Sequence, residues 1–296
     1  MTSGSTGCCV AYDSNFFNIP EVFMKDFVIY SYQFAPVDND LNLFFDVQKK
    51  NKELMMKKNI IFDSIIDDIV FKYRNKVYKK DIFFHKDDII IMRLANHKSI
   101  KLEKGFHVTQ QDDEPSCIII IDNRNKVQRV AIEKNTHSFS NTDTIKNILL
   151  RNLSRSLQEK ELALYMQKEY LSSEFWDICN KNKGKITKVV FSYKYPNLGR
   201  AHEQLKKLLG ESSSATNSSN TQITYTNTKG LVLSQNDDVL SGCVIDSSEG
   251  GEPVSLKIKG YSSTIKTGKT TKEVKIDEVD INNANLSTLK SVLENI

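Results

Sequence analysis

The chain is poor in proline and glycine, with 5 and 12 among its 296 residues. These low numbers exclude collagen-like chains and low-complexity chains rich in either residue. No uninterrupted apolar run approaches the roughly 18 residues of a membrane-spanning helix, so we expect no membrane span. The chain is 39% hydrophobic, which provides enough apolar surface for a packed core and excludes a wholly disordered protein.

Cysteine and histidine are also scarce, with five of each. The odd cysteine count and the lack of any CxxC pair do not indicate a disulfide framework. No two histidines have the i,i+3 or i,i+4 spacing of metal ligands, so we predict neither a metal site nor a cofactor. The first basic residue is Lys25, and no apolar segment precedes it in the pattern of a secretory signal. We therefore expect a cytoplasmic protein.

The first 138 residues are dominated by strand-like patterns. Aromatic and β-branched residues predict strands at 27–34, 65–73, 77–84 and 89–94, whereas 43–59 favours a helix. Residues 117–121 and 126–133 form the clearest hairpin. Its turn is expected at 122–125, because Asn and Asp tolerate positive φ. The polar segment 110–114 is expected to be a loop.

The pattern changes near residue 138. Apolar residues at helical spacing predict a helix over 145–157 that starts after Asn141, and a strand is expected at 162–166. A short helix from Ser172 and a strand at 186–195 follow, then a helix over 201–209, a mobile Ser-rich loop at 211–220 and a hairpin centred on 228–230. A helix or strand at 239–245, a strand at 254–258 and an amphipathic helix at 286–296 complete the chain.

These elements indicate an α+β protein, with a mostly antiparallel N-terminal sheet followed by a mixed α+β part. We predict a β-rich domain at 1–138 and an α+β domain at 139–296. One continuous sheet shared by both halves is the alternative.

The charge is unevenly distributed along the chain. Residues 124–210 contain 17 Lys and Arg against 8 Asp and Glu, whereas 105–123 and 211–256 are acidic. Clustered cations interleaved with aromatic side chains are typical of proteins that bind phosphates and stack on unpaired bases. The simpler alternative is a solvated basic face that the acidic segments neutralise.

We therefore predict a non-enzymatic protein that contacts nucleic-acid phosphates through the 124–210 block. The predicted contact residues are Arg124, Lys126, Arg129, Arg151, Arg155, Lys188, Tyr193, Lys194, Arg200, Lys206 and Lys207.

Two other functions stay open. The first is a structural subunit that binds a protein partner or a second copy, with 286–296 as a docking helix; the Lys-, Asn- and Ile-rich composition fits a bacterial defence or mobile-element system. The second is a metal-dependent phosphodiesterase with a degenerate site. Asp246 and Glu273-Val274-Lys275 match its acid and acid-x-Lys spacing only loosely. Gly268-Lys269-Thr270 resembles the end of a phosphate-binding loop, but Ser263 replaces the required glycine, so we interpret it as a basic loop.

Overall fold

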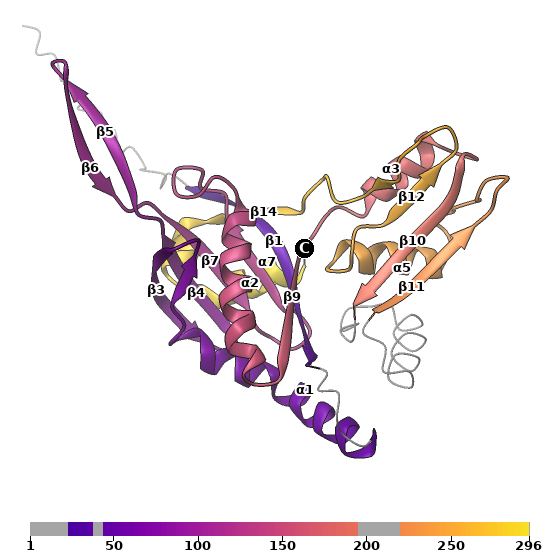
Figure 1. The fold of residues 1–296 in the computed structure, drawn as a ribbon, viewed down its shortest axis with the longest axis horizontal. Coiled ribbons are helices and arrows are strands. Elements are labelled where there is room, and N and C mark those ends of the chain that lie inside the picture. The colour runs from indigo at the N-terminus through magenta and orange to yellow at the C-terminus, as the bar shows by residue number, and fades with distance from the viewer. Residues whose placement is uncertain (1–22, 38–43, 195–219, 296) are drawn as a thin grey trace, which may run out of the picture.

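A computed structural model describes residues 23–37, 44–194 and 220–295. Its main feature is an eight-stranded antiparallel sheet, which confirms the α+β class (Figure 1). The sheet consists of β1 (Met24–Pro36), β2 (Phe71–Tyr73), β3 (Lys76–Lys86), β4 (Ile89–Ala95), β7 (Ser116–Asp122), β8 (Arg129–Glu133), β9 (Leu162–Lys168) and β14 (Glu273–Asp277).

Strand β1 pairs with three other strands of this sheet. It pairs with β8 along one edge and with β14 and β9 along the other, where Lys272 and Glu169 bond successively to the backbone of Ile29. Because β9 and β14 follow residue 138, the sheet includes strands from both halves of the sequence. The described chain therefore has the shared sheet of the alternative layout.

Helices cover both faces of the main sheet. Helices α1 (Phe44–Ile66) and α2 (Thr142–Gln158) pack on one face, and α6 (Glu278–Asn282) and α7 (Leu286–Glu294) on the other. The predicted stripe of α2 is fully buried, and the helix is capped by Asn141, which accepts the Thr144 N–H. Leu289 and Leu293 of α7 are also fully buried, so the stripe considered for docking packs within the chain.

A second, smaller lobe follows β9. Its sheet consists of β11 (Asn220–Thr226), β10 (Ile186–Lys194), β12 (Ser255–Ile258) and β13 (Ile265–Lys266). Helices α3 (Ser173–Lys181) and α5 (Asp238–Ser248) share its apolar core, in which Val189 and Phe191 of β10 are fully buried. The strand predicted at 186–195 is thus confirmed over its described part, Ile186–Lys194. We call these elements the second lobe and the rest the main lobe.

Strands β5 (Lys98–Lys104) and β6 (His107–Asp113) form a hairpin that projects from the main lobe (Figure 1). The predicted loop at 110–114 is therefore wrong, because Gln110–Asp113 belongs to β6. Every residue from 101 to 112 is exposed, so the hairpin buries no apolar face. Val108 is the only apolar residue of β6, so the alternation that identifies a half-buried strand is missing there.

Two other expectations are corrected. The predicted strand at 65–73 is mostly not a strand, since α1 continues to Ile66 and β2 includes only Phe71–Tyr73. The predicted hairpin at 228–230 is absent from the described chain, where β11 pairs with β10 instead and the Leu231 N–H donates to Ile186 O. The predicted helix at 201–209 and almost all of the Ser-rich loop at 211–220 lie outside the described residues.

No helix of the described ranges is long and apolar enough to cross a membrane.

Helix α1 carries a buried lysine. Lys58 is only 5% exposed, and its Nζ donates to Gln128 Oε1 at 3.3 Å. Burial lowers the pKa of Lys58 to about 8, because the charged ammonium loses its hydration. No carboxylate of the described residues lies within ion-pair distance of Nζ. The helix thus holds a charge that destabilises the folded state at neutral pH.

We expect Lys58→Met to raise the free energy of unfolding at pH 7 by about 2 kcal/mol. The wild-type protein should gain stability as the pH rises from about 8 toward 10.5, because the unfolded chain keeps its proton over that window. The variant should lack this gain. Urea unfolding at pH 7 and pH 10 measures both effects, and a variant less stable than the wild type at pH 7 contradicts them.

Candidate nucleic-acid interface

Five cationic side chains line a groove of about 600 Å³ on the main lobe, between the β2–β3 turn and helix α2. They are Lys72, Arg74, Lys76, Arg151 and Arg155. Asp68 is the acidic residue in the lining. None of the five cations forms an ion pair with a carboxylate of the described chain. We call this cavity the basic groove.

The β2–β3 turn places three of these cations. Arg74 and Asn75 have φ of 48° and 64°, and they connect the paired residues Tyr73 and Lys76. Positive φ at both central positions is typical of the type I′ turn, which matches the twist of the flanking strands. Lys72, Arg74 and Lys76 therefore lie within one tight hairpin at the end of the sheet.

A side-chain amide joins this hairpin to α2. Asn152 Oδ1 accepts the backbone N–H of Lys72 at 3.1 Å, and Asn152 Nδ2 donates to Lys72 O at 3.0 Å. This pair of bonds satisfies the free edge of β2, so the turn and helix have a fixed relation. Arg151 and Arg155 are four residues apart on α2 and thus share the helix face beside the groove.

The ring of Tyr73 stabilises the close approach of Arg74 and Arg151. The guanidinium carbons of Arg74 and Arg151 lie 5.4 Å and 6.0 Å from the centroid of its ring. An aromatic face attracts cations through its quadrupole, and each such contact contributes about 0.5–1 kcal/mol at an exposed site. The ring therefore offsets part of the repulsion between the two arginines.

Two predicted contact residues, Arg151 and Arg155, lie in the groove, but Arg124 is engaged elsewhere. Its guanidinium contacts the buried carboxylate of Asp122 at 2.7 Å and Glu294 at 2.9 Å, and it donates to Lys290 O. The hydrogen bonds that Arg124 donates to Asp122 raise the pKa of Arg124. Arg124 thus joins the β7–β8 connection to α7 and is not available for phosphate.

Arg129 is likewise removed from the proposed interface, because it is only 2% exposed. Its Nε and Nη2 donate to the two carboxylate oxygens of Glu169 at 2.8 Å and 3.0 Å, and its Nη1 donates to Leu293 O. Lys272 Nζ lies 3.4 Å from Glu169 and 3.3 Å from Glu249, which follows α5. Arg129 is therefore part of a buried ionic junction between the lobes.

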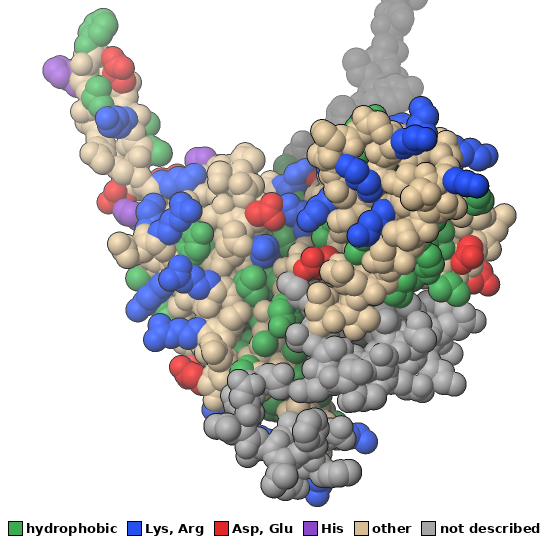
Figure 2. Space-filling model, turned by 45° about the vertical axis from the view of Figure 1, so that its right-hand side comes forward, with side chains coloured by type: hydrophobic (Ala, Val, Ile, Leu, Met, Phe, Trp, Pro, Cys, Tyr) green, Lys and Arg blue, Asp and Glu red, His purple; other side chains and the backbone are tan. Residues whose placement is uncertain are grey.

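Tyr193 cannot stack on a base, because its ring is buried against α5 and its hydroxyl donates to Cys243 O at 3.3 Å. Burial raises its pKa. Lys188 is exposed on β10 of the second lobe, Lys194 ends that strand, and Lys126 is exposed after β7. Arg200, Lys206 and Lys207 lie outside the described residues. The described cations of 124–210 are thus divided between the lobes, and Figure 2 shows Lys and Arg side chains on both.

The sequence prediction missed three groove residues. Residues 72–76 contain three basic residues, Lys72, Arg74 and Lys76, at alternate positions. This density of positive charge in a short turn is the sequence feature that could have indicated them. A charge count along the chain cannot show that this turn lies beside Arg151 and Arg155, because it does not record that α2 packs beside β2. Tertiary packing alone brings the two segments together.

The Gly268-Lys269-Thr270 segment holds an anion from its own chain. The three successive backbone N–H groups donate to the Glu174 carboxylate at 3.0–3.2 Å. Strand β14 follows, as expected, where a phosphate-binding loop would require a helix. Successive N–H groups form a concave anion site, and here Glu174 fills it and anchors the loop to α3.

Within the described residues, no group of three or more His, Cys, Asp or Glu side chains is arranged to hold a metal ion. Glu273, the acid of the proposed phosphodiesterase pattern, is paired with Lys134 at 2.9 Å. No protein-family model, curated protein or solved structure matches the chain.

Proposed function

We propose that this protein binds nucleic acid, without catalysing a reaction on it, through the basic groove. The supporting observation is the convergence of five cations, without a carboxylate partner in the described chain, around one concave surface. Protein cations that contact nucleic-acid phosphates displace the counterions condensed around them. This release of counterions drives sequence-independent binding. The proposal keeps Arg151 and Arg155 from the sequence prediction and replaces the other contacts with Lys72, Arg74 and Lys76.

The basic groove suits single-stranded nucleic acid better than double-stranded nucleic acid. The cations line a concave channel beside one half-buried aromatic side chain, Tyr73, instead of a protruding helix that would enter a major groove. Five phosphate contacts predict a log–log salt slope of about −3.5 for a single strand. Binding that is independent of salt would contradict the proposal.

We expect Arg151→Glu with Arg155→Glu to weaken binding of a fluorescein-labelled single-stranded oligonucleotide at least about tenfold at physiological salt. The slope should fall to about −2, because two of the five contacts are lost. Fluorescence anisotropy across a salt series measures both values, and single-stranded and duplex DNA and RNA are compared in parallel. Both arginines are exposed, so the exchange does not disturb the core.

Lys185→Glu with Lys188→Glu is the matched control. Both lysines are exposed on the second lobe, and the exchange changes the net charge by the same amount. This control should bind like the wild type. Equal losses in the two double variants would show that binding depends on net charge rather than on the groove, and would overturn the proposal.

A further inference from the structure

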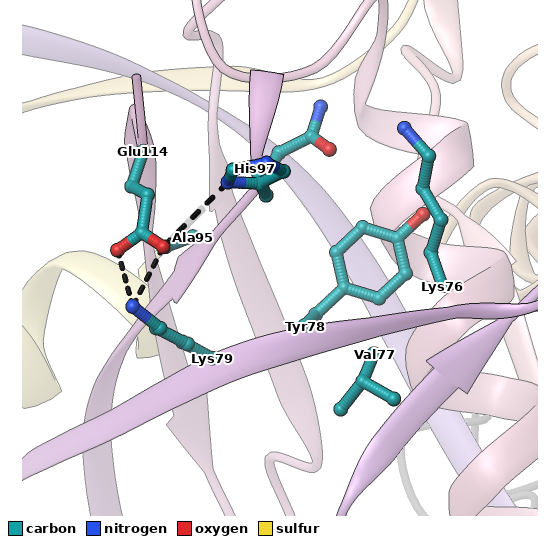
Figure 3. Close-up of a pocket in the computed structure, with 8 residues that line it drawn as sticks. Lys76, Val77, Tyr78, Lys79, Ala95, His97 and Glu114 are labelled. Atoms are coloured by element: carbon teal, nitrogen blue, oxygen red, sulfur yellow. Dashed lines mark hydrogen bonds and ion pairs between the residues drawn. The ribbon is translucent and has the colours of Figure 1, made fainter. Parts of the chain in front are cut away.

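A second cavity of about 350 Å³ adjoins the basic groove. It lies between β3, the end of β4 and the base of the β5–β6 hairpin, and Figure 3 shows Tyr78, His97 and Glu114 around it. Lys76 and Val77 line both cavities. The two cavities are therefore neighbours on the main lobe, and we call the second one the side pocket.

The walls of the side pocket are mainly apolar and rigid. Tyr78 is 8% exposed and packs on Phe139, with ring centroids 5.7 Å apart, so its ring is held in place from behind. Val77 and Ala95 add aliphatic surface, and His97 contributes a second ring. The volume of the side pocket lies at the lower end of the range for small-ligand pockets, about 300–1,000 Å³. Aromatic and aliphatic walls of this kind fit a planar heteroaromatic ring.

Two polar groups of the side pocket are hydrogen-bond acceptors. Asn96 Nδ2 donates to Ser138 O at 2.7 Å, which orients the amide, and Asn96 Oδ1 has no donor among the described residues. Glu114 accepts Lys79 Nζ at 2.5 Å and 2.6 Å, and this bond holds the pKa of Glu114 below its usual value. Lys79 is thus already paired, and Lys76 is assigned to the phosphates of the basic groove. Two acceptors favour a ring that carries an amino group.

We propose that the side pocket accepts one unpaired nucleobase with an exocyclic amino group, from the same strand whose phosphates lie in the basic groove. This inference rests on the proposed function. A base in a duplex is stacked on both faces and cannot enter without flipping, whereas a single strand presents its bases freely. Adenine, cytosine and guanine carry the amino donor, and thymine and uracil do not.

The pocket is tested by filling it. Ala95→Leu places a larger side chain at its wall, and Ala163→Leu on β9 is the matched control at another half-buried strand alanine. The probes are oligo(dA), oligo(dT), an oligonucleotide of abasic sites, and adenosine 5′-monophosphate. We expect Ala95→Leu to weaken oligo(dA) about tenfold with an unchanged salt slope, since one stacked base is lost. Abasic and oligo(dT) strands should bind the wild type and Ala95→Leu equally. They should bind the wild type more weakly than oligo(dA) does.

His97→Ala is a second pocket variant, which tests the inference even if Ala95→Leu fails to fold. The His97 side chain is 59% exposed, so its removal leaves the core intact, and we expect oligo(dA) to bind about threefold more weakly. If both pocket variants bind oligo(dA) like the wild type while Arg151→Glu with Arg155→Glu still weakens it, the pocket inference fails and the proposed function stands. If the groove variant is also unaffected, both fail. Monophosphate binding as tight as oligo(dA) and insensitive to the groove variant would indicate a free nucleotide and overturn the inference.

Discussion

Replacing Glu169 by alanine is expected to lower the free energy of unfolding by about 3–5 kcal/mol. Its carboxylate is fully buried and accepts both the Nε and the Nη2 of Arg129. Without it, the buried Arg129 and the half-buried Lys272 lose their shared counterion in a medium of low dielectric. Glu249 is too distant from Arg129, at 3.9 Å, to compensate fully.

Urea denaturation measures this effect, and a surface pair supplies the control. Lys134 and Glu273 are 2.9 Å apart but are 43% and 39% exposed, so Glu273→Ala should cost less than about 1 kcal/mol. Joint replacement of Arg129 by Met and Glu169 by Leu removes both charges and should restore part of the loss. A cost for Glu169→Ala as small as that for Glu273→Ala would show that water reaches the junction and that the ion pair is not needed there.

The position of Glu169 explains the size of the effect. Its N–H donates to Ile29 O on β1, its carbonyl accepts the Lys272 N–H, and the next residue, Tyr170, donates to Ser248 O. Main-chain bonds thus connect β1 directly to the segment that enters the second lobe. The buried charges lie where the two lobes meet, so their loss should affect the cooperativity of unfolding as well as its midpoint.

The sequence predicted those elements that bury one regular face. Helix α2 and strand β10 each pack one face against a core, so their apolar residues repeat with the period of the element. The β7–β8 hairpin is buried on both faces, and β7 is accordingly a continuous apolar run. The β5–β6 hairpin packs on no face, and β6 has no such pattern. The pairing of β1 with three strands was also hidden, because β9 and β14 pair with it across long sequence separations that periodicity does not record.

The β7–β8 turn shows how a correct position can have a different physical cause. Asp122 and Asn123 were assigned to the turn because they tolerate positive φ, yet only Gln128 has it there, at 44°. The Val127 and Gln128 N–H groups both donate to Arg124 O in a single helical turn. Asp122 and Asn123 are fully buried. The Asp122 carboxylate accepts the backbone N–H and the guanidinium of Arg124 within the same turn, whereas the Asn123 side chain bonds to Tyr32 on β1. Local propensity cannot separate a turn residue from a buried polar anchor of this kind.

The second large effect concerns that anchor, and we expect Asn123→Ala to destabilise the protein by about 3 kcal/mol. Asn123 Oδ1 accepts the Tyr32 hydroxyl at 2.7 Å, and Asn123 Nδ2 donates to Asn59 O and Asp63 Oδ1, both at 2.9 Å. The amide therefore joins β1 and the β7–β8 turn to α1. Alanine removes all three bonds at once: the buried Tyr32 hydroxyl keeps a longer bond to Asp122 O, at 3.3 Å, and the partly buried Asn59 O and Asp63 lose this donor. A buried polar group that loses its partner costs about 1–3 kcal/mol.

Asn123→Asp separates hydrogen bonding from side-chain volume and adds a pH signature. Burial already raises the pKa of Asp63, and the hydrogen bond from Asn123 opposes that rise. A second carboxyl at this site replaces the donor with a like charge, so the pKa of Asp63 rises further. A group whose pKa is raised in the folded state stabilises the protein below its unfolded value, and that contribution is lost as the pH increases through the folded value.

Thermal unfolding of Asn123→Asp should therefore resemble that of the wild type most closely near pH 4 and fall behind it as the pH approaches 7. Asn123→Ala introduces no titrating group, so its deficit should change much less over the same range. If the aspartate variant has the same deficit at both pH values, the new carboxyl is solvated. In that case the anchor contributes through its shape, and the hydrogen bonds to Tyr32 and Asp63 are not what joins α1 to the sheet.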